Sequence, residues 1–420
     1  MNDRQALIVG GGASGLMAAG YLAQAGIRTT LIERNPRTGA KLMITGKGRC
    51  NVTNDCDQRE FLNHVLHNPR FLYSALAGFS TADTQAFFEG LGVALKTERG
   101  RRVFPVSDQA GQIVDALRHY SQNATLLRGF CTAVEQENGA VTGIRLADGR
   151  GLSAPCVIVA TGGMSYPKTG SDGNGYRLAE KLGHPVIPPR PALVPLCCSQ
   201  SLCGRLAGLS LRNVTLSLWD KKTGNCLFEE LGEMLFTHNG VSGPLVLSAA
   251  SRIQAMEGGR YRLVLDLKPG LSEQQLHARL LRDFGQQLNK QFSNALHGLL
   301  PQALTEELVA LSGIPRDVKV NSITKEQRQG LVSLLKGFSL DVDGFAPMEE
   351  AIVTAGGVDV RRVNPKTMES TLVKGLYFTG EILDVDGETG GYNLQIAFST
   401  AVAAAKAIVA RYQKEEGACL

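Results

Sequence analysis

A glycine-rich turn near the start of the chain constrains the fold more than any other feature. Residues 10–15, GGGASG, fit the pattern GxGxxG. An apolar run over 6–9 precedes the turn, a helical pattern over 13–25 follows it, and a second strand pattern over 28–32 ends at an acid. A strand, a turn, a helix and a strand in this order open a parallel, doubly wound α/β sheet. The sequence therefore predicts a Rossmann-like domain at the N-terminus.

The same turn has the chemistry of a pyrophosphate site. Gly10 permits the tight turn, Gly12 lets the backbone approach the phosphates, and Gly15 lets the helix pack closely on the sheet. The first N–H groups of the helix, beginning at Ala13 and Ser14, and the helix dipole favour an anion at this point. We therefore expect a dinucleotide cofactor here.

The acid at the end of the second strand indicates which dinucleotides fit. Glu33 is expected to accept hydrogen bonds from the adenosine ribose, and an acid there disfavours a ribose 2′-phosphate. Arg34, beside it, is assigned to the same cofactor site. FAD and NAD share this fingerprint, so later segments must distinguish between them.

Three later segments favour FAD because they resemble those of glutathione-reductase-type flavoproteins. A strand pattern over 157–160 ends in Thr161 and Gly162, and another over 376–379 ends in Gly380 and Glu381. The resemblance implies that this last acid binds the flavin ribitol. The third segment opens the final helix, whose N-terminus would face the N1–C2=O edge of the flavin. Its expected cofactor-binding residues are Gly391, Tyr392, Asn393 and Leu394.

The order of patterns predicts an insertion within this FAD-binding domain. We expect the domain to comprise 1–190 and 351–420, with a β-barrel insertion over 191–270 to which 335–350 returns, and a helical insertion over 271–334. The proline-rich stretch 185–195 is interpreted as a domain boundary. An amphipathic helix is predicted over 71–90, a hairpin over 139–149 and a last helix over 394–412.

Composition narrows the class of protein. The 420 residues include nine cysteines, an odd number without a CxxC pair, which favours reduced thiols in a cytoplasmic protein over disulfides or zinc. No metal site is expected. Neither a signal peptide nor an apolar run long enough to cross a membrane is visible. A second GxGxxG in the same context is also missing, so NAD(P)H, as the reductant, would dock only transiently.

Several blocks along the chain carry a specific likeness. They are 38–42 (TGAKL), 45–54 (TGKGRCNVTN), 102–105 (RVFP), 162–167 (GGMSYP), 232–238 (GEMLFTH), 354–358 (TAGGV) and 384–393 (DVDGETGGYN). The chain resembles the bacterial BaiN/RdsA family of NAD(P)/FAD-dependent oxidoreductases, also described as aminoacetone-oxidase-like. The resemblance implies an FAD-binding Rossmann domain with an inserted β-barrel and a helical domain.

The resemblance implies flavin-dependent redox activity, but the activities proposed within the family differ. They are reduction of a uridine in ribosomal RNA to dihydrouridine, reduction of a conjugated double bond in bile-acid intermediates, and oxidation of aminoacetone. We expect reduction of an activated C=C bond with NAD(P)H, with the ribosomal RNA uridine as lead substrate and a steroid-like enone second. A non-catalytic, flavin-containing ribosome-binding factor is the alternative from a different class, and no protein partner is identifiable.

Residues in the GKGRCN loop are further candidates for the cofactor site. Lys47 and Arg49, together with Lys41 earlier in the loop after the second strand, could neutralise the pyrophosphate, hold the substrate or be plain surface charge. Gly48 and Asn51 are expected against the flavin. Cys50 is either a reactive thiol or a small packing residue beside the flavin ring.

The reduction also needs a proton for the α-carbon of the substrate. Tyr166, Lys168 and Cys50 are candidate donors, and either of the first two could instead be structural. His238 could line the substrate cavity or serve the fold. Asp386 and Glu388 could bind a substrate amine or cap a turn. Basic residues available for RNA phosphates are Arg99, Arg101, Arg102, Arg361, Arg362 and Lys366.

Overall fold

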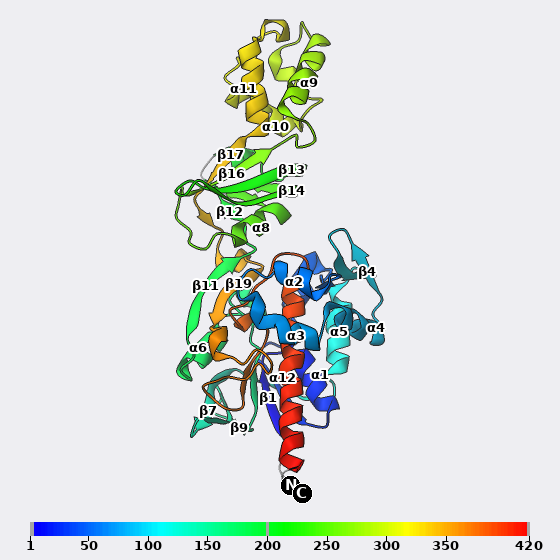
Figure 1. Cartoon of the computed structure of the whole chain (residues 1–420), viewed down its shortest axis with the longest axis vertical. Coiled ribbons are helices and arrows are strands. Elements are labelled where there is room, and N and C mark those ends of the chain that lie inside the picture. The colour runs from blue at the N-terminus through cyan, green and yellow to red at the C-terminus, as the bar shows by residue number, and fades with distance from the viewer. Residues whose placement is uncertain (1–3, 199–200, 418–420) are drawn as a thin grey trace. The chain divides into compact units, whose positions relative to one another are not determined.

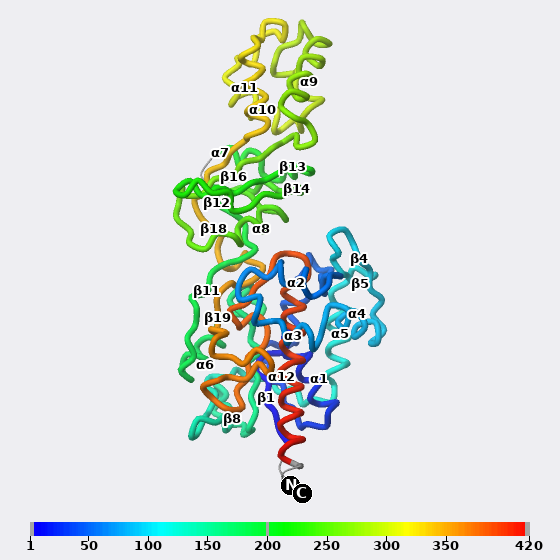
Figure 2. Tube along the Cα trace, in the orientation of Figure 1, coloured from blue at the N-terminus to red at the C-terminus, as the bar shows by residue number. Residues whose placement is uncertain are grey.

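A computed structural model describes residues 4–198 and 201–417, and Cys419 lies outside these ranges. The chain divides into two compact units, Met1–Ala192 with Pro347–Leu420, and Leu193–Ala346. In the first unit, segments near the two ends of the chain meet, because the Tyr412 hydroxyl at the end of the last helix donates to the Gln5 carbonyl in the first strand at 2.6 Å; Figure 2 traces both segments.

The core of the first unit is a five-stranded parallel sheet in the order β20-β10-β1-β2-β6. Its strands are β1 (Gln5–Val9), β2 (Arg28–Glu33), β6 (Thr125–Arg128), β10 (Val157–Val159) and β20 (Leu376–Phe378). Strands on the two sides of β1 come from distant parts of the chain, so the order reverses there. Ligands of such sheets bind beyond the carboxyl ends of the strands at this reversal.

Two helices from opposite ends of the chain cover this sheet. The helices α1 (Ala13–Gln24) and α12 (Tyr392–Gly417) pack against each other (Figure 1). By length and composition the stretch Tyr392–Glu415 could cross a membrane, but 61% of its most apolar window is buried inside the protein. Its apolar composition therefore serves the protein core.

The helix predicted over 71–90 is broken into α3 (Tyr73–Gly78) and α4 (Thr81–Gly90), so this prediction was wrong in its continuity. Ser80 caps α4 in a reciprocal capping box with Asp83. The carbonyl of Ser80 also accepts from the Gln395 side chain at 3.1 Å. Contacts with α12, distant in sequence, thus end the first helix.

The proline-rich stretch forms strand β11 (Val186–Ala192), which pairs antiparallel with β19 (Val353–Val358) (Figure 1). The register shifts between Ile187 and Arg190, where two prolines follow each other. Prolines lack the N–H of a regular ladder, so they are tolerated at such an irregularity. The division between the two units follows directly after Ala192.

Smaller elements complete the first unit. Two three-stranded sheets have the orders β3-β5-β4 and β7-β8-β9, and the second contains the predicted hairpin. The bounds are β3 (Thr53–Asn54), β4 (Leu95–Glu98), β5 (Arg102–Pro105), β7 (Cys131–Glu137), β8 (Ala140–Leu146), β9 (Gly151–Ser153), α2 (Gln58–Asn63), α5 (Ala110–Tyr120) and α6 (Asn174–Lys181). Short 3₁₀ segments lie at η1 (Leu42–Gly48), η2 (Pro69–Leu72), η3 (Pro167–Thr169), η6 (Met348–Glu350), η7 (Val360–Arg362) and η8 (Gly380–Ile382).

The second unit has a seven-stranded antiparallel sheet in the order β17-β16-β13-β14-β15-β12-β18. The strands are β12 (Leu196–Cys197), β13 (Ser210–Asp220), β14 (Asn225–Thr237), β15 (Gly240–Ser242), β16 (Tyr261–Asp266), β17 (Phe338–Val342) and β18 (Gly344–Phe345). Only Asp343 separates β17 from β18, which lie at opposite ends of this order. The sheet must therefore curl until its edges approach, as in an incomplete barrel.

Helices of the second unit lie mostly between β16 and β17 in sequence. They are α9 (Glu273–Gly285), α10 (Gln302–Leu311) and α11 (Lys325–Lys336), with η4 (Phe292–Asn294), η5 (Val320–Ser322) and, earlier in the chain, α7 (Ser201–Arg205) and α8 (Pro244–Ser251). Ser272 caps α9 by accepting from the Gln275 N–H at 3.2 Å.

Candidate active site

The glycine turn after β1 has little room except at one position. A Cβ added to Gly10 would lie 2.5 Å from the Ala160 carbonyl oxygen, and one on Gly15 would lie 1.8 Å from the Gly10 oxygen. A Cβ on Gly12 would meet nothing within 4 Å. Gly12 is also the N-cap of α1 and supplies no side chain to its N–H groups. This open helix N-terminus fits a diphosphate.

Glu33 and Arg34 are held by neighbouring segments. The Glu33 carboxylate is 9% exposed and accepts from the backbone N–H groups of Gly11 at 2.8 Å and Asn35 at 2.7 Å. Each carboxylate oxygen retains a second lone pair for a ribose hydroxyl. The Arg34 guanidinium instead pairs with Asp172 at 2.7 Å. Arg34 therefore ties the end of β2 to the loop before α6.

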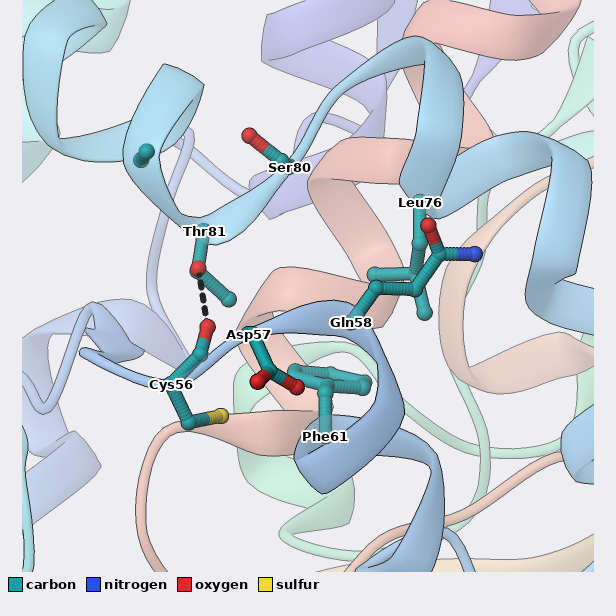
Figure 3. Close-up of a pocket in the computed structure, with 8 residues that line it drawn as sticks. Cys56, Asp57, Gln58, Phe61, Leu76, Ser80 and Thr81 are labelled. Carbon is teal, nitrogen blue, oxygen red and sulfur yellow. Dashed lines mark hydrogen bonds between the residues drawn. The ribbon is translucent and has the colours of Figure 1, made fainter.

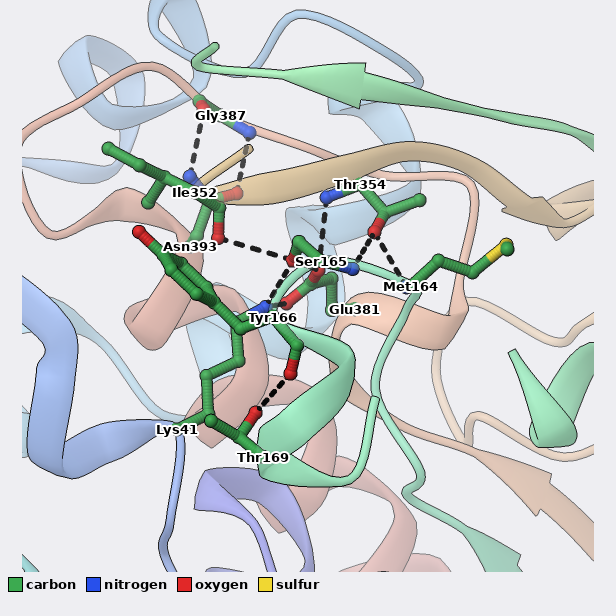
Figure 4. A network of polar contacts seen from close by, with 10 residues as sticks. All are labelled: Lys41, Met164, Ser165, Tyr166, Thr169, Ile352, Thr354, Glu381, Gly387 and Asn393. Atoms are coloured by element: carbon green, nitrogen blue, oxygen red, sulfur yellow. Dashed lines mark hydrogen bonds and ion pairs between the residues drawn. The ribbon is translucent and has the colours of Figure 1, made fainter. Parts of the chain in front are cut away.

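A polar network joins the ends of three strands (Figure 4). Lys41 Nζ lies 2.6 Å from both Glu381 Oε2 and Ser165 Oγ. The other oxygen of Glu381 accepts from the Ser165 hydroxyl and the Thr354 N–H, each at 3.0 Å. The Thr354 hydroxyl accepts from the N–H of Met164 at 2.8 Å. The predicted residues Lys41 and Glu381 are thus brought together.

Ser165 and Thr354 were missing from the predicted site, although both lie in the blocks that carry the family resemblance. Serine and threonine are common residue types, and these two do not belong to a recognisable binding motif. Only the fold shows that they come together. Together they fix the Glu381 carboxylate, which a single lysine could not orient.

The predicted residues of the GKGRCN loop, 46–51, lie in different environments. Arg49 donates to Asp108 at 2.8 Å and also pairs with Glu98, while its guanidinium lies 4.2 Å from the Phe104 ring. These contacts account for its charge without a phosphate. Gly48 has a φ of +83°, which suits glycine.

Cys50 packs in the protein core, and the Asn51 side chain binds backbone groups. Cys50 is fully buried, and burial raises the pKa of its thiol to about 12. A thiol held protonated in this way suits the packing interpretation better than a reactive role, and its place beside the flavin stays a prediction. The Asn51 amide can donate to the Thr53 carbonyl at 3.1 Å and accept from the Gly391 N–H at 3.0 Å.

The start of α1 contacts the segment that follows β20 beside the glycine turn. The Ser14 hydroxyl donates to the Thr379 carbonyl at 3.4 Å, and a Cβ on Gly380 would lie 2.8 Å from that hydroxyl oxygen. The buried hydroxyls of Thr161 and Thr379 have no hydrogen-bond partner among the described residues. Gly162 has a φ of +71°. This glycine-lined cradle with unsatisfied hydroxyls fits an FAD molecule lying across the sheet.

The start of α12 packs against β3. A Cβ on Gly391 would lie 2.3 Å from the Thr53 oxygen, so the backbones touch. Asn393 binds both backbone groups of Gly387, at 2.8 and 2.9 Å, and Leu394 is half-buried. Tyr392 is buried and stacks on His64 with ring centroids 4.7 Å apart.

The predicted proton donors lie in different environments. Tyr166 adjoins Ser165 in a left-handed conformation (φ +53°), and burial raises the pKa of its hydroxyl. Lys168 is exposed within η3. His238 is exposed in the turn between β14 and β15 of the second unit. Of the three, only Tyr166 directly adjoins the Lys41 network.

Sequence reasoning did not consider two histidines near this region. His64 Nδ1 lies 2.7 Å from Glu388 Oε2, and His67 Nδ1 contacts Asp386. More than 300 residues separate each pair, so no local pattern could predict them. Among the described residues, no group of three or more His, Cys, Asp or Glu side chains could hold a metal ion.

Residues outside this network line a small pocket (Figure 3). The Thr81 hydroxyl donates to the Cys56 carbonyl at 2.7 Å across it. The residues lining it are Cys56, Asp57, Gln58, Phe61, Leu76, Ser80, Thr81 and Ala82. Most belong to helix ends and caps, so the pocket follows from how α2 and α4 begin.

Known proteins match this chain along nearly all of its length. The model of the HI0933-like protein Rossmann domain matches residues 4–407. The ribosomal RNA dihydrouridine synthase of Escherichia coli (strain K12) is 35% identical over 420 residues, covering 98% of this chain and 99% of that protein. The 3-dehydro-bile acid delta(4,6)-reductase of Clostridium scindens is 32% identical, covering 96% and 98%.

A solved structure gives the same fold. The 3-ketosteroid delta1-dehydrogenase from Sterolibacterium denitrificans aligns with a TM-score of 0.52 at 14% identity, covering 97% of this chain and 100% of that one. The expected family, the Rossmann-type fold and the FAD cofactor are confirmed. This chain therefore belongs to the HI0933-like Rossmann family and is an FAD-dependent oxidoreductase.

Proposed function

We propose that this enzyme reduces a C=C bond conjugated to a carbonyl, with hydride derived from NAD(P)H, and that its substrate is a uridine in ribosomal RNA. The observation that carries this proposal is the 35% identity, over nearly the whole chain, to a ribosomal RNA dihydrouridine synthase. The name of the bile-acid reductase, at 32% identity, indicates related chemistry. Both reactions deliver hydride to a carbon conjugated to a carbonyl.

The proposed cofactor site uses the geometry at the ends of the strands. The N-terminus of α1 at Gly12 binds the pyrophosphate, and Glu33 accepts from the adenosine ribose. Glu381, fixed by Lys41, would hold the ribitol, and the N-terminus of α12 would hold the flavin ring and favour negative charge on it. When bound there, FAD supplies hydride transfer between NAD(P)H and the substrate.

Tyr166 is the proposed source of the substrate's proton. Burial raises the pKa of its hydroxyl, so the group stays protonated at neutral pH and can act as an acid. Lys168 remains a second candidate because it follows two residues later. His238 lies in the second unit, and its expected role stays a sequence-based prediction.

The basic surface supports an RNA substrate less strongly than the relatives do. Arg101 pairs with Glu60, and Arg361 pairs with Asp359, so two of the expected phosphate contacts already have carboxylate partners. A steroid-like enone is therefore the second candidate substrate, favoured by the bile-acid reductase relative.

A gene deletion tests the proposed substrate. Loss of one dihydrouridine from ribosomal RNA, restored by the wild-type gene, is the expected result. An unchanged dihydrouridine map would remove the RNA substrate. Restoration by a variant without flavin would instead favour a ribosome-binding role without catalysis. Rapid oxygen consumption with aminoacetone in the absence of NAD(P)H would favour an amine oxidase.

A further inference from the structure

Three side chains from distant segments of the first unit, Asp386, His67 and Arg190, are linked in series by hydrogen bonds. Asp386 has a side chain that is 2% exposed and contacts Nδ1 of His67. The other imidazole nitrogen, Nε2, lies 2.9 Å from an Nη2 nitrogen of Arg190. The second oxygen of Asp386 is buried without a hydrogen-bond partner among the described residues. A buried carboxylate thus anchors an imidazole, which in turn contacts a guanidinium.

The direction of these hydrogen bonds follows from the chemistry of the groups. An arginine side chain has only N–H donors, so His67 Nε2 must accept from Arg190. His67 Nδ1 then carries the ring proton and donates to Asp386. The imidazole therefore holds one nitrogen of the guanidinium group in place.

Two sets of contacts connect the Asp386–His67–Arg190 side chains to segments of the proposed flavin site. Arg190 on β11 is opposite Ala355 on β19, and the neighbouring Thr354 binds Glu381. Asp386 lies in the loop that leads to α12, where Asn393 holds the adjacent Gly387 at 2.8 Å. Arg190 is thus linked both to the strand that fixes Glu381 and to the loop before the N-terminus of α12.

We propose that Arg190 is a catalytic residue that binds the carbonyl oxygen conjugated to the substrate's C=C bond, and that His67 and Asp386 are its positioning residues. This inference rests on the proposed reduction of such a bond. When hydride adds to the β-carbon, a C–H bond forms and the π electrons move to the carbonyl oxygen. The guanidinium N–H groups stabilise this developing oxyanion. Proton transfer to the α-carbon then restores the carbonyl.

The same oxygen chemistry occurs in both candidate substrates. In uracil, O4 is conjugated to C5=C6, and in a 3-keto-4,6-diene steroid the 3-oxo group is conjugated to the diene. Arg190 therefore selects for a conjugated carbonyl in either source. Separate assays with ribosomal RNA from a deletion strain and with a 3-keto-4,6-diene steroid distinguish the two.

Arg190→Gln in the full-length holoenzyme is the main test. Loss of one oxyanion donor typically lowers kcat by about 10²–10³-fold, and we expect a loss of that size. Flavin content and reduction of the flavin by NAD(P)H without substrate should stay at wild-type levels. The exposed Arg145, paired with Glu135 on the β7–β8 hairpin, provides the matched control Arg145→Gln.

A binding measurement without turnover gives an independent readout. Hydrogen bonding to the carbonyl should shift the ultraviolet band of the bound dienone to longer wavelength, and Arg190→Gln should lose this shift. Should that variant fail to fold, Arg190→Lys keeps the charge without the fork and should still lower kcat.

Two substitutions of His67 test the positioning role. The amide of His67→Gln can reach the place of Nε2 and accept from Arg190, whereas that of His67→Asn can reach only the place of Nδ1. We expect His67→Asn to lose more of kcat than His67→Gln, with flavin content equal in both. Equal losses would contradict the positioning role.

The outcomes separate this inference from the proposed function. If the wild-type enzyme reduces neither substrate, the proposed function fails and the assignment of Arg190 fails with it. If the wild-type enzyme reduces one of them and Arg190→Gln does so within about threefold in kcat, with the dienone shift retained, only the assignment of Arg190 is overturned.

Discussion

Gly12 is the residue at which the glycine turn leaves room for a ligand. At Gly10 and Gly15 a backbone carbonyl oxygen, of Ala160 and of Gly10 respectively, leaves no room for a side chain, whereas a Cβ on Gly12 would meet nothing within 4 Å. A larger residue at Gly12 is therefore compatible with the fold but fills the expected place of the pyrophosphate. The three glycines of one motif thus serve two separate purposes, folding and binding.

Gly12→Glu should therefore abolish FAD binding without unfolding the protein. Its carboxylate would occupy and repel the place of the phosphates at the α1 N-terminus. The measurements are flavin content after purification and the circular dichroism spectrum. The control is Gly90→Glu at the exposed end of α4, where a Cβ also meets nothing within 4 Å. Tight flavin binding by Gly12→Glu would contradict the placement of the pyrophosphate.

At the scale of elements, local sequence predicts best where a segment needs only its own pattern. Strands β1 and β2 and the helix α1 follow directly from residues 6–33. The break between α3 and α4 does not, because the Ser80 carbonyl is directed to Gln395 on α12. Strand β11 was also missed, since its prolines predict a boundary unless the partner strand β19 is known.

Gln395→Met should destabilise the protein by about 2–4 kcal/mol, because it leaves buried polar groups without partners. The Gln395 amide donates to the Phe79 and Ser80 carbonyls and accepts from the Thr53 hydroxyl at 2.6 Å. Urea unfolding measures the change in free energy. Gln24→Met, at the exposed end of α1, is the control. A loss no larger than that of the control would show that these contacts do not hold the break.

In the candidate site, too, some residues could be predicted from sequence and others could not. Gly12, Glu33 and Glu381 could be assigned to a proposed cofactor site from sequence, because they belong to motifs with fixed places in this fold. The partners of those residues could not, since Ser165, Thr354 and His67 have no motif of their own. Arg49 was expected at the cofactor, but the carboxylates of Glu98 and Asp108 hold it.

For the molecule as a whole, one buried histidine links stability to pH. His184 is 2% exposed, and burial lowers its pKa to about 4. The unfolded chain therefore binds this proton more tightly, with a pKa near the ordinary 6.5. Its contribution to stability is fully present above pH 6.5 and is lost as the pH falls to 4, on the order of 3 kcal/mol.

His184→Gln should accordingly flatten the fall in unfolding free energy between pH 6.5 and pH 4. Other groups titrate equally in both proteins, so the difference between the two slopes isolates this residue. Urea unfolding at a series of pH values provides the measurement. Identical slopes would mean that His184 takes up its proton equally well in the folded protein.

The most direct test of the proposed reaction uses the enzyme reduced in advance and kept without oxygen. Ribosomal RNA from a strain lacking the gene is then added while the absorbance of oxidised flavin is followed. We expect this absorbance to return and one dihydrouridine to form for each flavin reoxidised. A flavin that stays reduced with RNA and with a 3-keto-4,6-diene steroid, yet reoxidises promptly in air, would contradict the proposed reaction.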